Sequence, residues 1–187
     1  MLQANISGRS YRFSDGLSGF GGIVEMSGSA FQFDAGINGG TWIANTNAVL
    51  IGWNGSARIP IAVDDATLVL KGGHRAVSGV TAGTYSIGAN AALKVGESAS
   101  VEGVTFAAGA TLEMLDEGAL SDRTQEYVAL TSATPITGVL PTLVQPPDVQ
   151  RGKWKLVQKT IPGEGEDPDT YQIVAEFRPS GFMIIVQ

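Results

Sequence analysis

The chain has 187 residues, of which 43% are hydrophobic and 16% are charged, and its net charge is −6. This apolar content is enough for a folded core and argues against wholesale disorder, while an acidic surface argues against nucleic-acid binding. The absence of cysteine excludes disulfides, thiolate nucleophiles and Cys-based zinc sites, and the 25 glycines predict a chain that turns often and forms little helix.

The N-terminal residues, Met1 to Ala4, lack the basic start and the apolar run of a signal peptide. No apolar run reaches the length of about 18 residues that a membrane-spanning helix needs, so we expect no membrane insertion. A cysteine-free chain rich in Gly, Ser, Thr, Asn and Ala is typical of secreted bacterial β-proteins. We therefore expect a secreted or outer-surface protein whose leader is absent from this sequence.

A short strand of the form apolar–x–apolar recurs through the first two-thirds of the chain. Its copies are Tyr11–Phe13, Phe31–Phe33, Val49–Ile51, Leu68–Leu70, Leu93–Val95 and Leu112–Met114. They start 20, 18, 19, 25 and 19 residues apart. Such a period, with glycine between the strands, is the signature of a β-solenoid, in which each coil hides its apolar residues against the next. We expect Phe33, Leu70, Val95 and Met114 to share one interior column.

A second series of strands runs in step with the first. Its clearest members are Val24–Met26, Ile43, Ile59–Ile61, Tyr85–Ile87 and Val104–Phe106. The long interval falls at the same place in both series, which predicts a single insertion at residues 71–82. A β-sandwich also has a strand about every 8–12 residues, but the two series in step favour the solenoid.

The middle residue of each strand in the first series is expected to face outward, because side chains alternate along a strand. These residues are Arg12, Gln32, Leu50, Val69, Lys94 and Glu113. The outer face is then polar at both ends and apolar at Leu50 and Val69, which we expect on adjacent coils. Such a patch needs a cover: either the insertion or the C-terminal unit, or else a partner or carbohydrate bound through Trp42 or Trp53.

The pattern changes near residue 120. Strands are expected at Tyr127–Thr131, Lys153–Lys159, Tyr171–Phe177 and Phe182–Val186, with an acidic turn at 161–169. This alternation predicts an antiparallel unit over residues 121–187 that caps the open end of a solenoid over residues 1–120.

The coils of about 19 residues, rich in Gly, Ala and Thr, resemble the passenger regions of autotransporter-type bacterial surface proteins. The segment Tyr127–Thr131 followed by Ile136–Gly138 is similar to the strand–Gly pattern at the end of such passengers, and Lys153–Val157 and Tyr171–Val174 are similar to the strands that follow it. The resemblance covers most of residues 8–177. It implies a mainly β fold with a right-handed parallel β-helix and a secreted or surface location. It implies no particular activity.

Residues able to carry out catalysis are few. His74 is the only histidine and no Gly-x-Ser-x-Gly motif occurs, so a Ser-His-Asp triad is poorly supported. One histidine and no cysteine also predict no metal site, and we expect no cofactor. Carboxylates remain: two acids flanking a substrate hydrolyse glycosidic bonds, and two sharing a proton activate water against a peptide. The candidates are Asp34, Asp64 and Asp65.

Two functions therefore stay open at this point. The leading hypothesis is a non-catalytic, adhesin-like module whose ligand is a host glycoprotein or a polysaccharide. Its candidate ligand-binding residues are Trp42, Trp53, His74 and Arg75. The alternative is a secreted hydrolase of mucin-like glycoprotein or polysaccharide that uses the three aspartates. The sequence does not indicate an oligomeric state.

Overall fold

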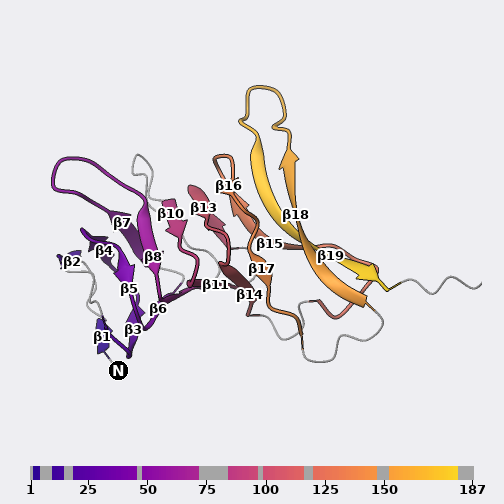
Figure 1. Ribbon diagram of the computed structural model, residues 1–187. Helices are drawn as coiled ribbons and strands as arrows, with labels where there is room; N and C mark the ends of the chain where they lie inside the picture. Colours follow the sequence, from indigo (N-terminus) through magenta and orange to yellow (C-terminus); the bar gives the residue numbers. More distant parts are fainter. Residues whose placement is uncertain are drawn as a thin grey trace, which may run out of the picture.

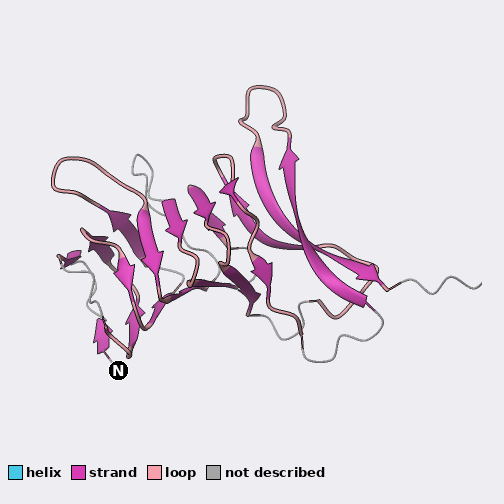
Figure 2. Ribbon diagram, viewed as in Figure 1, coloured by secondary structure: helices cyan, strands magenta, loops and turns pink. Residues whose placement is uncertain are grey.

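The protein is mainly β. The computed structural model describes residues 2–4, 10–14, 19–45, 48–71, 84–96, 99–115, 120–146 and 152–180. Over these ranges the regular elements are all strands, and no helix is found (Figure 2). In particular, no helix in the described ranges has the length and apolar character needed to cross a membrane.

The largest sheet has seven strands, and neighbouring strands come from successive coils of the chain. Its order is β1 (Leu2–Ala4), β3 (Ile23–Met26), β6 (Thr41–Ala44), β9 (Thr67–Leu70), β11 (Ala92–Val95), β14 (Thr111–Met114) and β17 (Thr142–Leu143). Every pair in this sheet is parallel. Parallel neighbours need a crossover connection, and here the rest of each coil supplies it. The predicted solenoid is thus confirmed.

Two further parallel sheets form the other sides of the coils. The first contains β2 (Ser10–Phe13), β4 (Ala30–Phe33) and β7 (Val49–Gly52). The second contains β5 (Ile37–Asn38), β8 (Ile61–Asp64), β10 (Thr84–Ile87), β13 (Gly103–Phe106) and β16 (Thr137–Gly138). The chain visits the sheets in rotation, so that β3, β4 and β5 make one coil and β6, β7 and β8 the next. Figure 1 shows these strands stacked one behind another along the molecule.

The two strand series predicted from spacing were wrong as series, because each crosses from one sheet to another. The members starting at residues 11, 31 and 49 lie in the three-stranded sheet, whereas those starting at 68, 93 and 112 lie in the seven-stranded sheet. The cause is the loop at 53–60. The first residue of β6 follows the first residue of β4 by 11 residues, but the first residue of β9 follows that of β7 by 18. Counting 19 residues from Val49 therefore reaches β9, which lies in a different sheet from β7. The predicted insertion at 71–82 lies, except for Lys71, outside the described residues.

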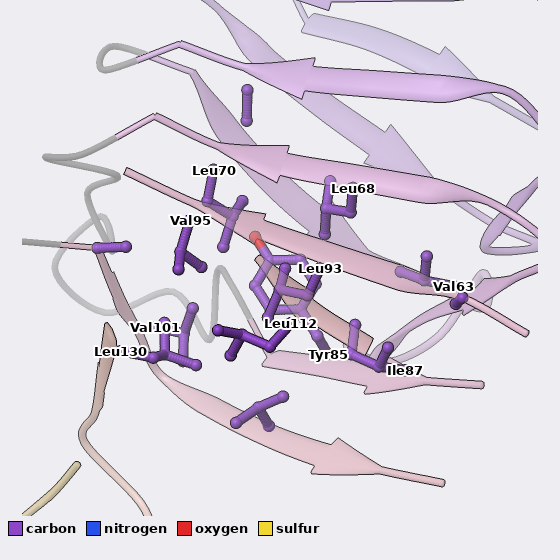
Figure 3. Packing of buried hydrophobic residues seen from close by; sticks show 14 of the residues in the cluster. Val63, Leu68, Leu70, Tyr85, Ile87, Leu93, Val95, Val101, Leu112 and Leu130 are labelled. Carbon is purple, nitrogen blue, oxygen red and sulfur yellow. The ribbon is translucent and has the colours of Figure 1, made fainter. Parts of the chain in front are cut away.

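The interior is a set of stacked apolar columns, one for each inward position of each sheet. Leu70, Val95 and Met114 are successive register partners, as predicted. Phe33 belongs to a different column, between Phe13 and Gly52, so its predicted place was wrong. Figure 3 shows how side chains from different sheets meet in the shared core; the labelled ones include Leu68, Leu70, Tyr85, Leu93, Val95 and Leu112.

Some predicted outward positions are polar, but the predicted apolar centre needs correction. Lys94 and Glu113 form an ion pair of 2.8 Å between adjacent coils. Leu50, however, is fully buried and is the register partner of Phe31. The prediction that the Leu50 side chain faces outward was therefore wrong. Val69 lies in the seven-stranded sheet beside Ile43 and Lys94, away from Leu50. The predicted apolar patch of Leu50 and Val69 therefore does not exist.

The C-terminal sheet is an extension of the solenoid. Its order is β12 (Ser100–Val101), β15 (Tyr127–Ser132), β19 (Thr170–Pro179) and β18 (Gly152–Ile161). The pair β12–β15 is parallel, and β15–β19 and β18–β19 are antiparallel. Beyond residue 120, β15, β16 and β17 still pair in parallel with the preceding coil, and the antiparallel hairpin follows them. The strand predicted at Phe182–Val186 lies outside the described residues.

The hairpin closes the C-terminal end of the core (Figure 1). Trp154 of β18 is 2% exposed, and its ring packs edge-on against Tyr127 at 5.5 Å and Phe177 at 5.4 Å. The side-chain amide of Gln145 donates to the Trp154 carbonyl at 2.8 Å and accepts from the Trp154 N–H at 2.9 Å. A side chain thereby takes the place of a neighbouring strand at this edge of the sheet.

Candidate functional site

Trp42, one of the predicted ligand-binding residues, is a core residue. It is 1% exposed, its register partners in β3 and β9 are Val24 and Leu68, and its ring meets those of Phe13 and Phe33 at 5.2 and 5.5 Å. Its indole N–H donates to the Gly39 carbonyl at 3.0 Å. The prediction that Trp42 offers a binding surface was wrong, because this tryptophan occupies an inward position of the repeat.

Of the three predicted acids, Asp34 lies apart from Asp64 and Asp65, which follow one another in the chain. Asp64 ends β8 and lies opposite Asn38, and Asp65 occupies the next turn with φ of 48°. Asp34 precedes Asn38 by four residues, at the other end of that side of the coil. Both Asp64 and Asp65 are exposed. Asp34 therefore does not join the other two acids, which are consecutive residues where β8 ends. His74 and Arg75 lie outside the described residues.

Asp34 is held as a carboxylate by its neighbours. Gln32 donates to one carboxyl oxygen at 2.8 Å, and the Arg12 guanidinium binds the other at 2.6 Å. The hydrogen bond from Gln32 and the ion pair with Arg12 lower the pKa of Asp34 below its ordinary value. A general acid needs the opposite shift. Asp34 is suited to accepting hydrogen bonds rather than to giving up a proton.

The structure does bring Asp34 beside Trp53, on the outer side of the coil. Phe33 and Gly52 are register partners, and the Trp53 N–H donates to the Phe33 carbonyl at 2.9 Å. The next residues along, Asp34 and Trp53, are thus neighbours on adjacent coils. Because Phe33 and Gly52 point inward, alternation directs these two side chains outward.

A short hairpin adds Arg58 to this neighbourhood. Trp53 and Arg58 form an antiparallel bridge, which places the two side chains on the same face. We call the five residues Arg12, Gln32, Asp34, Trp53 and Arg58 the Trp53 corner. In Figure 1 the loop between β7 and β8, which carries Trp53 and Arg58, extends away from the stacked strands.

Local hydrogen bonds fix the hairpin. The Asn54 N–H donates to the Ala57 carbonyl at 3.1 Å, and the Asn54 side-chain oxygen accepts from the Ser56 N–H and hydroxyl at 3.1 Å and from the Ala57 N–H at 2.9 Å. Gly52 allows the chain to fold back, since a Cβ there would collide with the Ile59 carbonyl oxygen. A binding group on such a loop is preorganised, which reduces the entropy lost on binding.

The chemistry of the Trp53 corner suits a polar ring-shaped ligand. Trp53 is half-buried and supplies an apolar, polarisable ring face. Asp34 supplies carboxylate oxygens that accept hydroxyl hydrogens, and Arg58 supplies guanidinium donors. Metal binding finds no support in the described ranges, where no three acidic or imidazole groups are close enough to share an ion.

Sequence reasoning found Asp34 and Trp53 but missed that they are neighbours, and it missed Arg58. The signal for Arg58 was present, because Asn54-Gly55 is a dipeptide typical of hairpin turns and lies between Trp53 and Arg58.

Comparison of the chain with protein-family models, with curated proteins and with solved structures gave no match.

Proposed function

We propose that the protein is a non-catalytic β-solenoid module of a secreted or cell-surface protein, and that it binds a host glycoprotein or a polysaccharide on its flank. The observation that carries the proposal is the Trp53 corner, where the ring and guanidinium of a hydrogen-bonded loop lie beside a paired carboxylate of the adjacent coil. Saccharide sites combine these groups because a sugar ring has an apolar C–H face and a rim of hydroxyls.

Binding is favoured over hydrolysis by the placement of the acids. Glycoside hydrolysis needs two carboxyl groups about 5–10 Å apart, one of them protonated. Asp34 lies at the opposite end of its side of the coil from Asp64, and its ion pair keeps it ionised. The hydrolase hypothesis has no comparable arrangement to support it in the described part of the chain.

The location and the relation to autotransporter-type passengers belong to the same proposal. The parallel coils ending in an antiparallel hairpin are consistent with the resemblance seen in the sequence. The lack of cysteine and the Gly/Ser/Thr/Asn/Ala bias favour export.

A glycan-array screen followed by calorimetry tests the proposal. The wild-type protein is expected to bind a subset of glycans, and Trp53→Ala to weaken that binding at least tenfold, since loss of an aromatic anchor costs about 1.5 kcal/mol or more. Val139→Ala is the control, because Val139 is 55% exposed near the C-terminal end. The non-catalytic assignment would be overturned if the wild-type protein released reducing ends or peptides from mucin or pectin and a triple variant did not. That variant carries Asp34→Asn, Asp64→Asn and Asp65→Asn.

A further inference from the structure

We propose that the ligand of the Trp53 corner carries a carboxylate, as uronic and sialic acid units do, and that Arg58 binds it. The inference rests on the proposed saccharide-binding function and names the substrate class. It is drawn from the buried, unpartnered Nη1 of Arg58 and from the position of that residue beside Trp53.

Arg58 lacks the partner that the other described arginines have. Its Nη1 atom is buried and makes no hydrogen bond. Arg12 pairs with Asp34, Arg178 pairs with Glu176, and Arg123 lies over the Phe177 ring at 5.0 Å. No ion pair joins Arg58 to any acid in the described ranges. A guanidinium that has lost water on one edge without gaining an acceptor is stabilised by an anion at its remaining donors.

The nearest acidic group of the corner does not fill this role. Asp34 already accepts from Arg12 and Gln32, so its charge is compensated. Asp34, Trp53 and Arg58 follow one another across three neighbouring strands, with Trp53 in the middle. At about 4.8 Å per strand, the backbones of Asp34 and Arg58 lie about 10 Å apart, which leaves room for one sugar ring over Trp53.

The arrangement gives each part of an acidic sugar its own contact. The apolar face of the ring stacks on Trp53, the carboxylate meets the donors of Arg58 other than Nη1, and hydroxyls on the far side donate to Asp34. Arg58 is half-buried as a residue, so part of its side chain reaches solvent while Nη1 does not. The hydrogen bonds of Asn54 hold the loop in place before the ligand arrives.

Calorimetry with matched pairs of saccharides tests the proposal. One arm compares a sialylated oligosaccharide with its desialylated form, and the other compares an oligogalacturonate with its methyl ester. At least one acidic member is expected to bind about tenfold or more tightly than its neutral counterpart, because a charge-assisted hydrogen bond is worth about 1.5–3 kcal/mol. Arg58→Gln is expected to remove this preference, and Arg178→Gln, at an ion pair on β19, to keep it.

A measurement on the unmodified protein guards against a variant that fails to fold. Binding of the acidic member is expected to weaken as NaCl rises from about 0.05 to 0.5 M, while binding of a neutral member changes little. Equal binding of acidic and neutral members, or equal losses for both in Arg58→Gln, would overturn the role of Arg58 and leave the proposed function in place. Failure of the wild-type protein to bind any saccharide would overturn both.

Discussion

The two ends of the solenoid are finished in different ways. At the C-terminal end, β18 and β19 cover the last coil, Trp154 is buried, and the Gln145 amide satisfies the backbone of Trp154. At the other end, β1 and β2 are the outermost described strands of their sheets, and the inward-facing rings of Tyr11 and Phe13 are only half-buried.

Among the described residues, the two N-terminal rings stack on the rings of the next coil. Tyr11 stacks on Phe31 with ring centres 5.4 Å apart, and Phe13 stacks on Phe33 at 5.1 Å. Phe31 and Phe33, one coil further in, are fully buried. Stacking on one face buries half of an aromatic ring, whereas the hairpin buries Trp154 completely. The two ends are therefore expected to respond differently to the same kinds of substitution.

The largest contrast is expected from removing one ring at each end. Trp154→Ala should lower the free energy of unfolding by about 3–5 kcal/mol, because a fully buried ring leaves a cavity. Phe13→Ala should cost about half as much, since its ring is already partly in water. Urea unfolding followed by circular dichroism measures both. A Phe13→Ala cost equal to that of Trp154→Ala would show that the N-terminal end is as well covered as the C-terminal end.

The next effect concerns the edge of the hairpin. Gln145→Ala leaves the N–H and carbonyl of Trp154 without partners, which should cost about 1–3 kcal/mol. It also frees a strand edge for pairing with another chain, so association that rises with concentration is expected by size-exclusion chromatography. Gln125→Ala, in an exposed turn where Gln125 bonds Asp122, is the control and should change stability by no more than about 0.5 kcal/mol. A monomeric, fully stable Gln145→Ala would mean that the amide does not protect the edge.

A smaller contrast, with opposite signs at the two ends, is expected for tyrosine hydroxyls. The Tyr11 hydroxyl is buried without a partner, so Tyr11→Phe should leave stability unchanged or raise it by about 1 kcal/mol. The Tyr127 hydroxyl accepts from the Asp122 N–H at 2.8 Å, so Tyr127→Phe should cost about 0.5–1.5 kcal/mol. Thermal unfolding of the two variants in parallel checks the signs. Destabilisation by Tyr11→Phe would mean that its hydroxyl is satisfied in solution.

Some features of the fold could be predicted from the sequence and others could not. The repeat of short strands predicted the solenoid and the change near residue 120 predicted an antiparallel unit, because both depend on local alternation and turn chemistry. Which strands share a sheet was not predictable from spacing, since the loop at 53–60 shifts the count by seven residues, 18 against 11. The inward direction of Leu50 was missed because Val49, Leu50 and Ile51 are all apolar and offer no alternation to read.

The same limits applied to the candidate site. Asp34 and Trp53 were identified one at a time, but their proximity follows from the pairing of Phe33 with Gly52, which no local pattern encodes. Trp42 and Trp53 looked equivalent in the sequence. The register of β6 against β3 and β9 shows that Trp42 faces the core, and the pairing of β4 with β7 shows that Trp53 follows an inward glycine.

The smallest expected effect is the acid sensitivity of an ion pair near each end. The bonds from Gln32 and Arg12 lower the pKa of Asp34 below its ordinary value of 3.8, and Lys159 lowers that of Glu126 below 4.5. A group whose folded pKa is depressed contributes stability above its unfolded pKa, and loses it as pH falls through the folded value. Both contributions are therefore complete above about pH 5, and each is lost only as pH falls through the folded pKa, which is below 3.8 for Asp34 and below 4.5 for Glu126. In urea unfolding between about pH 6 and 3, Asp34→Asn and Glu126→Gln should each flatten the decline only slightly, because exposed ion pairs are weak. If only Glu126→Gln flattens it, the Arg12–Asp34 pair contributes nothing to folding, and its place beside Trp53 would be explained by ligand binding alone.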